Sequence, residues 1–232
     1  MGSIYLIRHG QASFGQDDYD NLSPLGVEQS TILGQHFKSI GLSFDTVYGG
    51  AMKRHRQTAD ACLEAMSATD SEFISLPEFN EYDHENMVHI YKPEFKSKTA
   101  MATYLAKQSN PKKAFQEVFA NAMKRWVSGD FDEEYPESWD QFKRRCRQGL
   151  DRIIASSTGS QNVAVFTSGG PISSNVQQLL DVPDARAMNI NWAMVNCSVT
   201  HCLYNNDRVS LNYFNNYSHL QTNIDSKFVT YR

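Results

Sequence analysis

The chain has 232 residues, of which 41% are apolar, so it is long enough to bury a full hydrophobic core. Its 22 Lys and Arg and 26 Asp and Glu residues give a net charge of −4, which argues against a general nucleic-acid-binding protein, because such proteins are usually basic. No apolar run approaches the roughly 18 residues of a membrane span, and the N-terminus has no signal-peptide pattern, so we expect a cytoplasmic protein that binds no membrane.

The cysteines indicate neither a disulfide framework nor a zinc site. Cys62, Cys146, Cys197 and Cys202 form no CxxC pair, and no His/Cys spacing resembles a zinc motif. We therefore expect reduced and mostly buried thiols, and no bound metal.

The first third of the chain alternates predicted strands and helices. Ser23 is typical of a helix N-cap, Pro24 suits the first helical position, and Gly41 ends the helix. The predicted elements are strands over 4–7, 44–48 and 73–76 and helices over 24–40 and 51–66. This β-α-β-α-β order is typical of a layered α/β fold.

Helical patterns interrupt this order over residues 86–157, where Ser138 and Gln141 form a capping box. Residues 86–150 hold 12 Lys and Arg but 8 Asp and Glu, so this segment could steer anionic ligands, although a solvated surface of mixed charge explains the same counts. The later predicted elements are a strand over 163–166, a helix over 171–180, a hairpin of 195–204 and 209–214 with its turn at Asn205-Asn206-Asp207, and a loosely held tail from Ser218.

These elements predict one domain over residues 1–232. Its fold class is α/β: a three-layer α/β/α sandwich around a mostly parallel sheet. The helical insertion at about 86–157 is expected to act as a lid over the C-terminal ends of the strands.

Arg8, His9 and Gly10 follow the first predicted strand, at the end of the sheet where α/β proteins bind ligands. An imidazole there can attack phosphorus, and the planar fork of Arg8 can hold phosphate oxygens. Arg54 opens the helix after the second strand, so two arginines could clamp one phosphate from two sides. Alone, an Arg-His-Gly triplet is more often a surface turn, and the segment around Arg54 could equally be the solvated basic first turn of a helix.

Further motifs occur in a fixed order along the chain. They are Arg8-His9-Gly10, Leu22-Ser23-Pro24-Leu25-Gly26, Arg54-x-x-Gln57-Thr58-Ala59, Asn196-x-Ser198-x-Thr200 and Asn216-x-x-His219-Leu220. In this combination the chain resembles the histidine phosphatase superfamily, also called the phosphoglycerate-mutase-like family, over nearly its whole length.

The resemblance implies a metal-independent phosphohistidine mechanism without a cofactor. His9 would be the nucleophile, and Arg8 and Arg54 would stabilise charge on the phosphate oxygens. An acidic residue after the third strand would protonate the leaving oxygen. The spacing best matches Glu81, with Glu78 second and Glu85 as the remaining candidate.

The turn after the fourth strand departs from the family pattern. Ser168 stands where the family usually has a second phosphate-binding histidine, and a serine brings no positive charge. His84, His89 or a lysine of the lid could substitute for that cation, whereas His55 should point elsewhere, because neighbours on a helix do not share a face. If the missing cation limits the reaction, Ser168→His should raise turnover.

Other groups could also contact the phosphate. The backbone N–H groups of Gly169 and Gly170 lie at a predicted helix start and could cradle an anion. Gln11 and Ser13 follow the nucleophile and could touch the phosphate or the leaving group, whereas Gln29 is expected to pack or cap within its helix.

The leading hypothesis is a phosphatase that hydrolyses a small phosphate monoester. The alternative is a weak or inactive phosphate-binding pseudoenzyme, motivated by Ser168, and a phosphoglycerate-type mutase ranks below both because the sequence shows no second anion pocket. The expected partner is a small phosphorylated substrate, and an exposed edge of the C-terminal hairpin would be one route to a homodimer.

Overall fold

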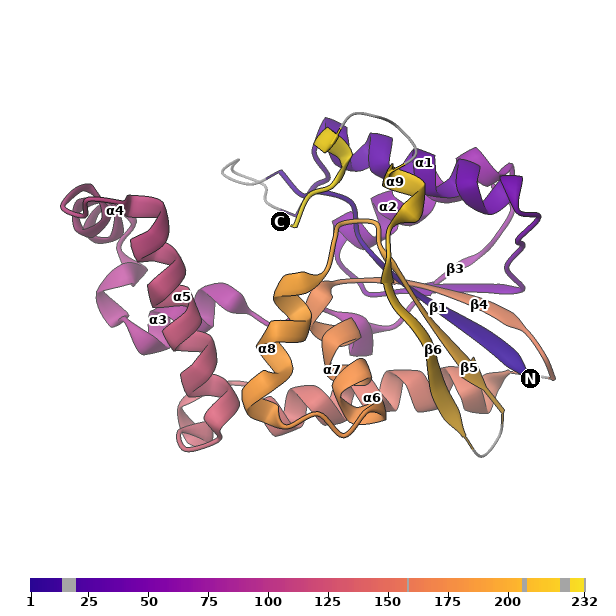
Figure 1. The fold of residues 1–232 in the computed structure, drawn as a ribbon. Coiled ribbons are helices and arrows are strands. Elements are labelled where there is room, and N and C mark those ends of the chain that lie inside the picture. Colours follow the sequence, from indigo (N-terminus) through magenta and orange to yellow (C-terminus); the bar gives the residue numbers. More distant parts are fainter. Residues whose placement is uncertain (14–19, 158, 206–207, 222–225, 232) are drawn as a thin grey trace.

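A six-stranded mixed sheet lies at the centre of the molecule (Figure 1). The computed structural model describes residues 1–13, 20–157, 159–205, 208–221 and 226–231. In the described part of the chain the strand order is β3-β2-β4-β1-β5-β6, with β1 to β4 mutually parallel and β5 antiparallel to both of its neighbours. The strands are β1 Gly2–Arg8, β2 Thr46–Gly49, β3 Phe73–Ser75, β4 Asn162–Thr167, β5 Val199–Tyr204 and β6 Val209–Asn216.

Helices follow each of the first four strands, with one long helical stretch between β3 and β4, whereas β5 and β6 are consecutive along the chain. They are α1 Pro24–Ser39, α2 Lys53–Met66, α3 His84–Tyr91, α4 Lys98–Ala106, α5 Pro111–Ser128, α6 Trp139–Ser156, α7 Gly169–Leu179, α8 Asp184–Ala193 and α9 Ser218–Gln221. Short 3-10 turns are η1 Pro77–Phe79, η2 Pro93–Lys96, η3 Asp132–Glu134 and η4 Ser226–Phe228.

Local sequence signals set several helix ends. The Ser23 hydroxyl accepts a hydrogen bond from the Gly26 N–H at 3.1 Å, which satisfies a free donor at the start of α1. Gly41 follows α1 at a φ of +69°, in the left-handed region that glycine adopts readily. The predicted capping box of Ser138 and Gln141 is present at the start of α6.

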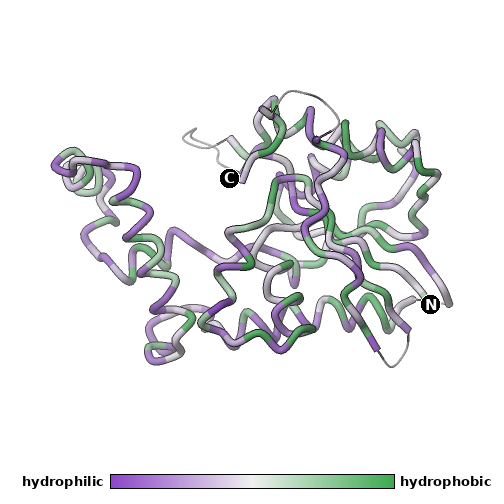
Figure 2. The backbone as a smooth tube through the Cα atoms, in the orientation of Figure 1, coloured by the Kyte–Doolittle hydropathy of each residue, from purple (hydrophilic) through white to green (hydrophobic). Residues whose placement is uncertain are grey.

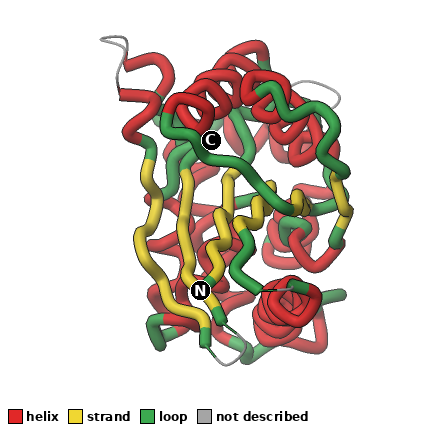
Figure 3. Tube along the Cα trace, turned by 90° about the vertical axis from the view of Figure 1, so that its right-hand side faces the viewer, coloured by secondary structure: helices red, strands yellow, loops and turns green. Residues whose placement is uncertain are grey.

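Helices cover both faces of the sheet, as Figures 1 and 3 show from two directions. On one face, Leu33 and Phe37 of α1 pack with Ile7 of β1 and with residues of α2. On the other face, Leu150 and Ile153 of α6 pack with Leu6 and with residues of α7. Each buried aliphatic side chain contributes about 2 kcal/mol to folding. This arrangement confirms the predicted three-layer α/β/α fold.

Helices α3 to α5 project as an arm beyond the sheet (Figure 1). Figure 2 shows purple and green alternating along the arm, as expected for amphipathic helices. The predicted insertion at 86–157 also includes α6, but the second half of α6 packs against the sheet and not within the arm. Its first half joins the arm through a cluster that contains Trp126, Trp139 and Phe142.

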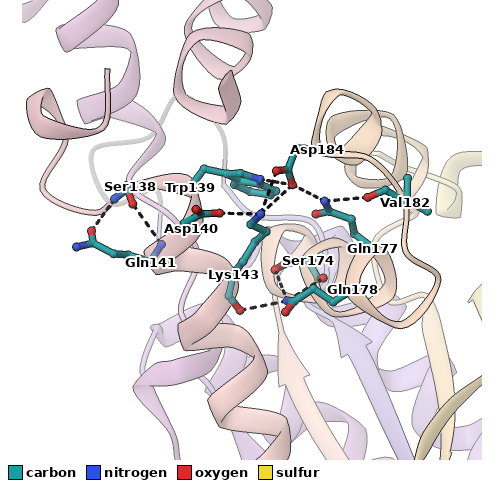
Figure 4. A network of polar contacts seen from close by, with 10 residues as sticks. All are labelled: Ser138, Trp139, Asp140, Gln141, Lys143, Ser174, Gln177, Gln178, Val182 and Asp184. Atoms are coloured by element: carbon teal, nitrogen blue, oxygen red, sulfur yellow. Dashed lines mark hydrogen bonds and ion pairs between the residues drawn. The ribbon is translucent and has the colours of Figure 1, made fainter. Parts of the chain in front are cut away.

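A polar network ties the base of the arm to the sheet domain (Figure 4). The Asp184 carboxylate, at the start of α8, accepts hydrogen bonds from Trp139 Nε1 at 2.8 Å and from Gln177 Nε2 at 2.6 Å, and it pairs with Lys143 at 3.0 Å. Because these partners come from α6 and α7, the network fixes three helices around one carboxylate.

The tail from Ser218 is more firmly held than the sequence predicts. Leu220 and Phe228 are buried in the core beside α1 and α2, and the Thr230 hydroxyl donates to Asn196 Oδ1 at 3.0 Å. The tail prediction was therefore wrong for the described residues 218–221 and 226–231, because apolar side chains at two positions anchor it. Positions 206 and 207 of the predicted hairpin turn lie outside the described residues.

None of the described helices combines the length and hydropathy of a membrane-spanning segment.

Candidate active site

The candidate site lies where β1, β4 and β2 end side by side. Beyond the strands, the His9 N–H still donates to the Thr167 carbonyl at 2.8 Å, and the Gly50 N–H donates to the Phe166 carbonyl at 3.0 Å. Helices α2 and α7 begin a few residues further on. The ends of parallel strands and two helix N-termini therefore converge, an arrangement that favours an anionic ligand.

His9 is buried, and its tautomer follows from its hydrogen bond. Its Nδ1 lies 2.7 Å from the Gly10 carbonyl oxygen, which can only accept, so Nδ1 carries the proton and Nε2 keeps its lone pair. Burial, and then the charges of Arg54 and Arg8, hold the pKa of His9 well below 6.5. The imidazole is therefore neutral at pH 7 and can act as a nucleophile through Nε2.

Close backbone contacts fix the loop after β1. A Cβ on Gly10 would lie 2.4 Å from the Gly26 carbonyl oxygen, so only glycine fits where this loop crosses the start of α1. The Gly10 N–H donates to Thr58 Oγ1 at 3.1 Å, which ties the same loop to α2. These contacts hold His9 between two helices.

The C-terminal tail and the loop before β5 hold Arg8 and the His9 backbone. Arg8 Nη2 donates to the Tyr231 carbonyl at 3.0 Å, and Nη1 donates to the Met194 carbonyl. Asn196 Nδ2 donates to the His9 carbonyl at 3.1 Å. The tail therefore helps to orient the first arginine.

Arg54 is almost fully buried in the first turn of α2. Its Nη1 pairs with Asp20 at 2.7 Å, and its Nη2 lies 3.4 Å from Ser168 Oγ. The guanidinium thus reaches from α2 to the turn after β4. The structure brings Arg8, His9, Arg54 and Ser168 together, as the sequence predicts.

Of the three candidate acids, Glu81 is the one that lies beside the start of α7, at the candidate site. Its Oε2 accepts a hydrogen bond from the Gly170 N–H at 3.2 Å, at the start of α7. A Cβ on Gly170 would lie 2.0 Å from Glu81 Oε1, so the glycine makes room for the carboxyl group. Burial raises the pKa of Glu81 above 4.5, although Arg54 and the hydrogen bonds oppose the shift. A raised pKa suits a carboxyl group that donates a proton.

The other two glutamates lie elsewhere. Glu78 pairs with Arg152 of α6 at 3.0 Å, and Glu85 is exposed in the first turn of α3. These contacts favour Glu81 over both.

His55 was expected to point away from the site, and that prediction was wrong. It is fully buried, its Nε2 lies 2.7 Å from Ser168 Oγ, and its ring centre is 5.8 Å from that of His9. Helix neighbours diverge by about 100°, but here Arg54 and His55 approach Ser168 from two sides because α2 begins beside the turn after β4. His84 and His89, the expected substitutes, lie on α3 in the arm.

Gln11 and Ser13 bond within the loop that carries them. Gln11 Oε1 accepts from the Ser23 hydroxyl at 2.9 Å, and the Ser13 hydroxyl donates to the Leu22 carbonyl at 3.1 Å. Their contact with phosphate stays a prediction. Gly169 is buried at the start of α7, where a Cβ would lie 2.3 Å from Asn191 Oδ1. Gln29, expected to act within its helix, instead links the Gln11 N–H to the tail.

Arg145 is a further residue that the sequence analysis did not single out. From α6, its Nη1 donates to the carbonyls of Glu78 and Asn80, each at 3.0 Å, and it pairs with Glu137 at 2.6 Å. These bonds fix the segment that leads to Glu81. No signal in the sequence distinguishes Arg145 from the other basic residues of the Lys143–Arg147 run.

The chain is similar to proteins of known name. The 2,3-bisphosphoglycerate-dependent phosphoglycerate mutase of Bartonella henselae is 30% identical over 102 residues, which cover 41% of this chain and 50% of that protein. That of Bartonella bacilliformis is 30% identical over 99 residues, covering 40% and 48%. The aligned part of the chain thus spans about half the length of these curated relatives.

Solved structures share the fold across almost the whole chain. A phosphoglycerate mutase from Bacillus anthracis matches with a TM-score of 0.67 at 20% identity, covering 94% of each chain. A phosphoserine phosphatase variant from Entamoeba histolytica, solved with phosphoserine, matches with a TM-score of 0.67 at 18% identity, covering 95% of this chain and 100% of that one. A mycobacterial glucosyl-3-phosphoglycerate phosphatase matches with a TM-score of 0.62 at 19% identity, covering 93% and 99%.

The family model of the histidine phosphatase superfamily, branch 1, matches residues 4–217. This match includes the three strand ends that form the site. The chain belongs to the histidine phosphatase superfamily.

Proposed function

We propose that this protein is a metal-independent phosphatase that hydrolyses a small phosphate monoester through a phosphohistidine on His9. The observation that carries the proposal is the state of His9: a buried, neutral imidazole with Nδ1 committed to the Gly10 carbonyl, beside Arg8 and Arg54. A neutral nucleophile between two fixed positive charges suits attack on a phosphate dianion.

The reaction would proceed in two steps. His9 Nε2 forms a bond to phosphorus as the ester P–O bond breaks, and the Glu81 carboxyl group gives its proton to the departing alkoxide. Water then attacks the phosphohistidine, the Glu81 carboxylate takes a proton from that water, and inorganic phosphate leaves with His9 restored. Arg8 and Arg54 would stabilise the charge on the phosphoryl oxygens in both steps.

A panel of phosphate monoesters, assayed for released inorganic phosphate, tests this proposal. We expect turnover by the wild-type protein and loss of at least 1,000-fold in His9→Ala, because the nucleophile is removed. His36→Ala is the matched control, since His36 lies near the end of α1 and stacks on His219, away from the site. Turnover that survives His9→Ala would contradict the proposal.

The same assay separates two alternatives. Ser168, which brings no charge to the pocket, motivates the hypothesis of a phosphate-binding pseudoenzyme; that hypothesis predicts orthovanadate binding without turnover of any ester. The phosphoglycerate mutases among the relatives motivate the second, which predicts interconversion of 2- and 3-phosphoglycerate with little release of inorganic phosphate.

A further inference from the structure

We infer that His55 is a positioning residue that acts through Ser168. It donates a hydrogen bond to the Ser168 hydroxyl oxygen, and the hydroxyl proton is thereby directed at a phosphoryl oxygen. This inference rests on the proposed function, because it concerns the same candidate phosphate site. It assigns a role to a buried imidazole that the two-step reaction does not otherwise use.

The first support is that Ser168 does not cap its own helix. It occupies the N-cap position of α7, where a serine oxygen usually accepts a backbone N–H from the first turn, but its side chain makes no such bond. The Oγ atom faces two groups of α2 instead: His55 Nε2 at 2.7 Å and Arg54 Nη2 at 3.4 Å.

The second support is the hydrogen-bonding capacity of a hydroxyl group. A serine oxygen accepts two hydrogen bonds and donates one. Arg54 can only donate, so it takes one lone pair of Ser168. If His55 Nε2–H donates to the second, the hydroxyl proton has no acceptor among these neighbours and is left for the ligand.

The third support is the surroundings of His55. It is fully buried, its Nδ1 lies so close to Gly50 that a Cβ there would be 2.4 Å away, and burial, followed by the charge of Arg54, lowers the pKa of His55 to about 3. His55 Nδ1 has no hydrogen-bond partner among the described residues, so the single N–H of the neutral imidazole is assigned to Nε2, where the Ser168 hydroxyl oxygen can accept it. An apolar side chain would fill this space at a lower desolvation cost, so a polar group here indicates a function.

A double-mutant cycle on His55 and Ser168 tests the inference, with kcat and KM measured on an aryl phosphate and the Kd measured for orthovanadate. Ser168→Ala should lower kcat/KM on the order of 100-fold, as loss of one transition-state donor does. His55→Ala should lower it about 10-fold, mainly in kcat. In the Ser168→Ala background, His55→Ala should lower kcat/KM by less than a further factor of about three, because the two substitutions remove the same interaction.

His55→Gln supplies the control for folding, since its amide N–H can reach about the position of Nε2. We expect it to recover at least a third of the wild-type kcat/KM. Single effects that multiply in the double variant, or a His55→Gln variant no better than His55→Ala at equal melting temperature, would overturn the inference. If the wild type binds orthovanadate but hydrolyses no ester, the proposed function fails and the cycle on the vanadate Kd still decides the inference. A wild type that does neither overturns both.

Discussion

The side chains around His9 form two unlike groups, named here the cationic wall and the neutral wall. The cationic wall consists of Arg8 and Arg54, whose guanidinium groups are both buried. The neutral wall consists of the Ser168 hydroxyl group and the His55 imidazole, whose pKa is lowered, together with the adjoining Glu81 carboxyl group, whose pKa burial raises. The cationic wall can neutralise a phosphate, whereas the neutral wall can only donate, accept or transfer protons. In the proposed reaction, charge binding and proton transfer therefore fall to different sides of one site.

Breaking the cationic wall should have the largest effect. Arg54→Ala removes a positive charge from the phosphate pocket and should lower kcat/KM on the order of 1,000-fold. The matched control is Arg56→Ala, two residues on, where the guanidinium is exposed and pairs with Asp60 within the helix. That exposed ion pair contributes little to folding stability, so kcat/KM of Arg56→Ala should lie within twofold of the wild-type value. Equal losses in the two variants would contradict the assignment.

Removing the proposed proton donor, Glu81, should have the next largest effect. Glu81→Gln should lower kcat/KM about 100-fold on an alkyl phosphate but much less on a nitrophenyl phosphate, because kcat/KM reports the step that cleaves the ester bond and a good leaving group needs no proton there. Glu78→Gln is the control, since Glu78 pairs with Arg152 outside the pocket. A loss in kcat/KM that is independent of the leaving group would show that Glu81 is not the acid.

Adding a histidine to the neutral wall should lower activity, contrary to what the sequence alone suggested. His55 Nε2 already lies 2.7 Å from Ser168 Oγ, so the imidazole of Ser168→His has no space. We expect a fall of about 10-fold or more in kcat/KM. The paired change His55→Ala with Ser168→His frees that space and should recover part of the loss. A rise in turnover for the single variant would restore the original expectation.

The support behind the neutral wall can be weakened without touching the pocket. Arg145→Ala leaves backbone carbonyls near Glu81 and the Glu137 carboxylate without their donor. Urea unfolding should show that the free energy of unfolding falls by about 2 kcal/mol. On alkyl phosphates, kcat should fall about fivefold, because Glu81 loses its fixed position. Arg147→Ala, which removes an exposed pair with Asp151, should change neither.

The buried histidines should make the fold sensitive to acid. Burial lowers the pKa of His55 to about 3 and that of His219 to about 4, whereas both should titrate near 6.5 in the unfolded chain. Between pH 6.5 and these two pKa values, the unfolded chain binds more protons than the folded chain, so the free energy of unfolding falls as the pH falls. Above pH 6.5 these two histidines leave the free energy of unfolding constant. At pH 5 each histidine should lower the free energy of unfolding by about 2 kcal/mol relative to its value above pH 6.5. Urea unfolding of His55→Gln should show a shallower decline; an unchanged slope would contradict this account.

The sequence predicts the cationic wall better than the neutral one, for a physical reason. Arg8 and His9 come directly after a buried strand and Arg54 begins a helix, so strand and helix periodicity are enough to bring them to one edge of the sheet. His55 required the exact orientation of the first turn of α2 against the turn after β4, which residue spacing does not encode. The hold of the tail on Arg8 is also a long-range contact, because Tyr231 acts through its backbone carbonyl and any residue could supply that group.

Local sequence patterns predict the sheet and the main helices. They do not predict that the two halves of α6 pack into different hydrophobic clusters. The stripe of Trp139, Phe142 and Cys146 predicts a helix, but not that Leu150 further along α6 covers the sheet. A single amphipathic face serves two cores, and only packing decides where one ends.

Trapping the covalent intermediate tests the central claim most directly. Wild-type protein and Glu81→Gln would be mixed with a nitrophenyl phosphate, quenched in base within milliseconds, digested and analysed by mass spectrometry, because a phosphorylated imidazole survives base better than acid. We predict a phosphoryl group on the peptide that contains His9, more of it in Glu81→Gln, and none in His9→Ala. A phosphoryl group on Ser168, or turnover without any phosphopeptide, would contradict the account.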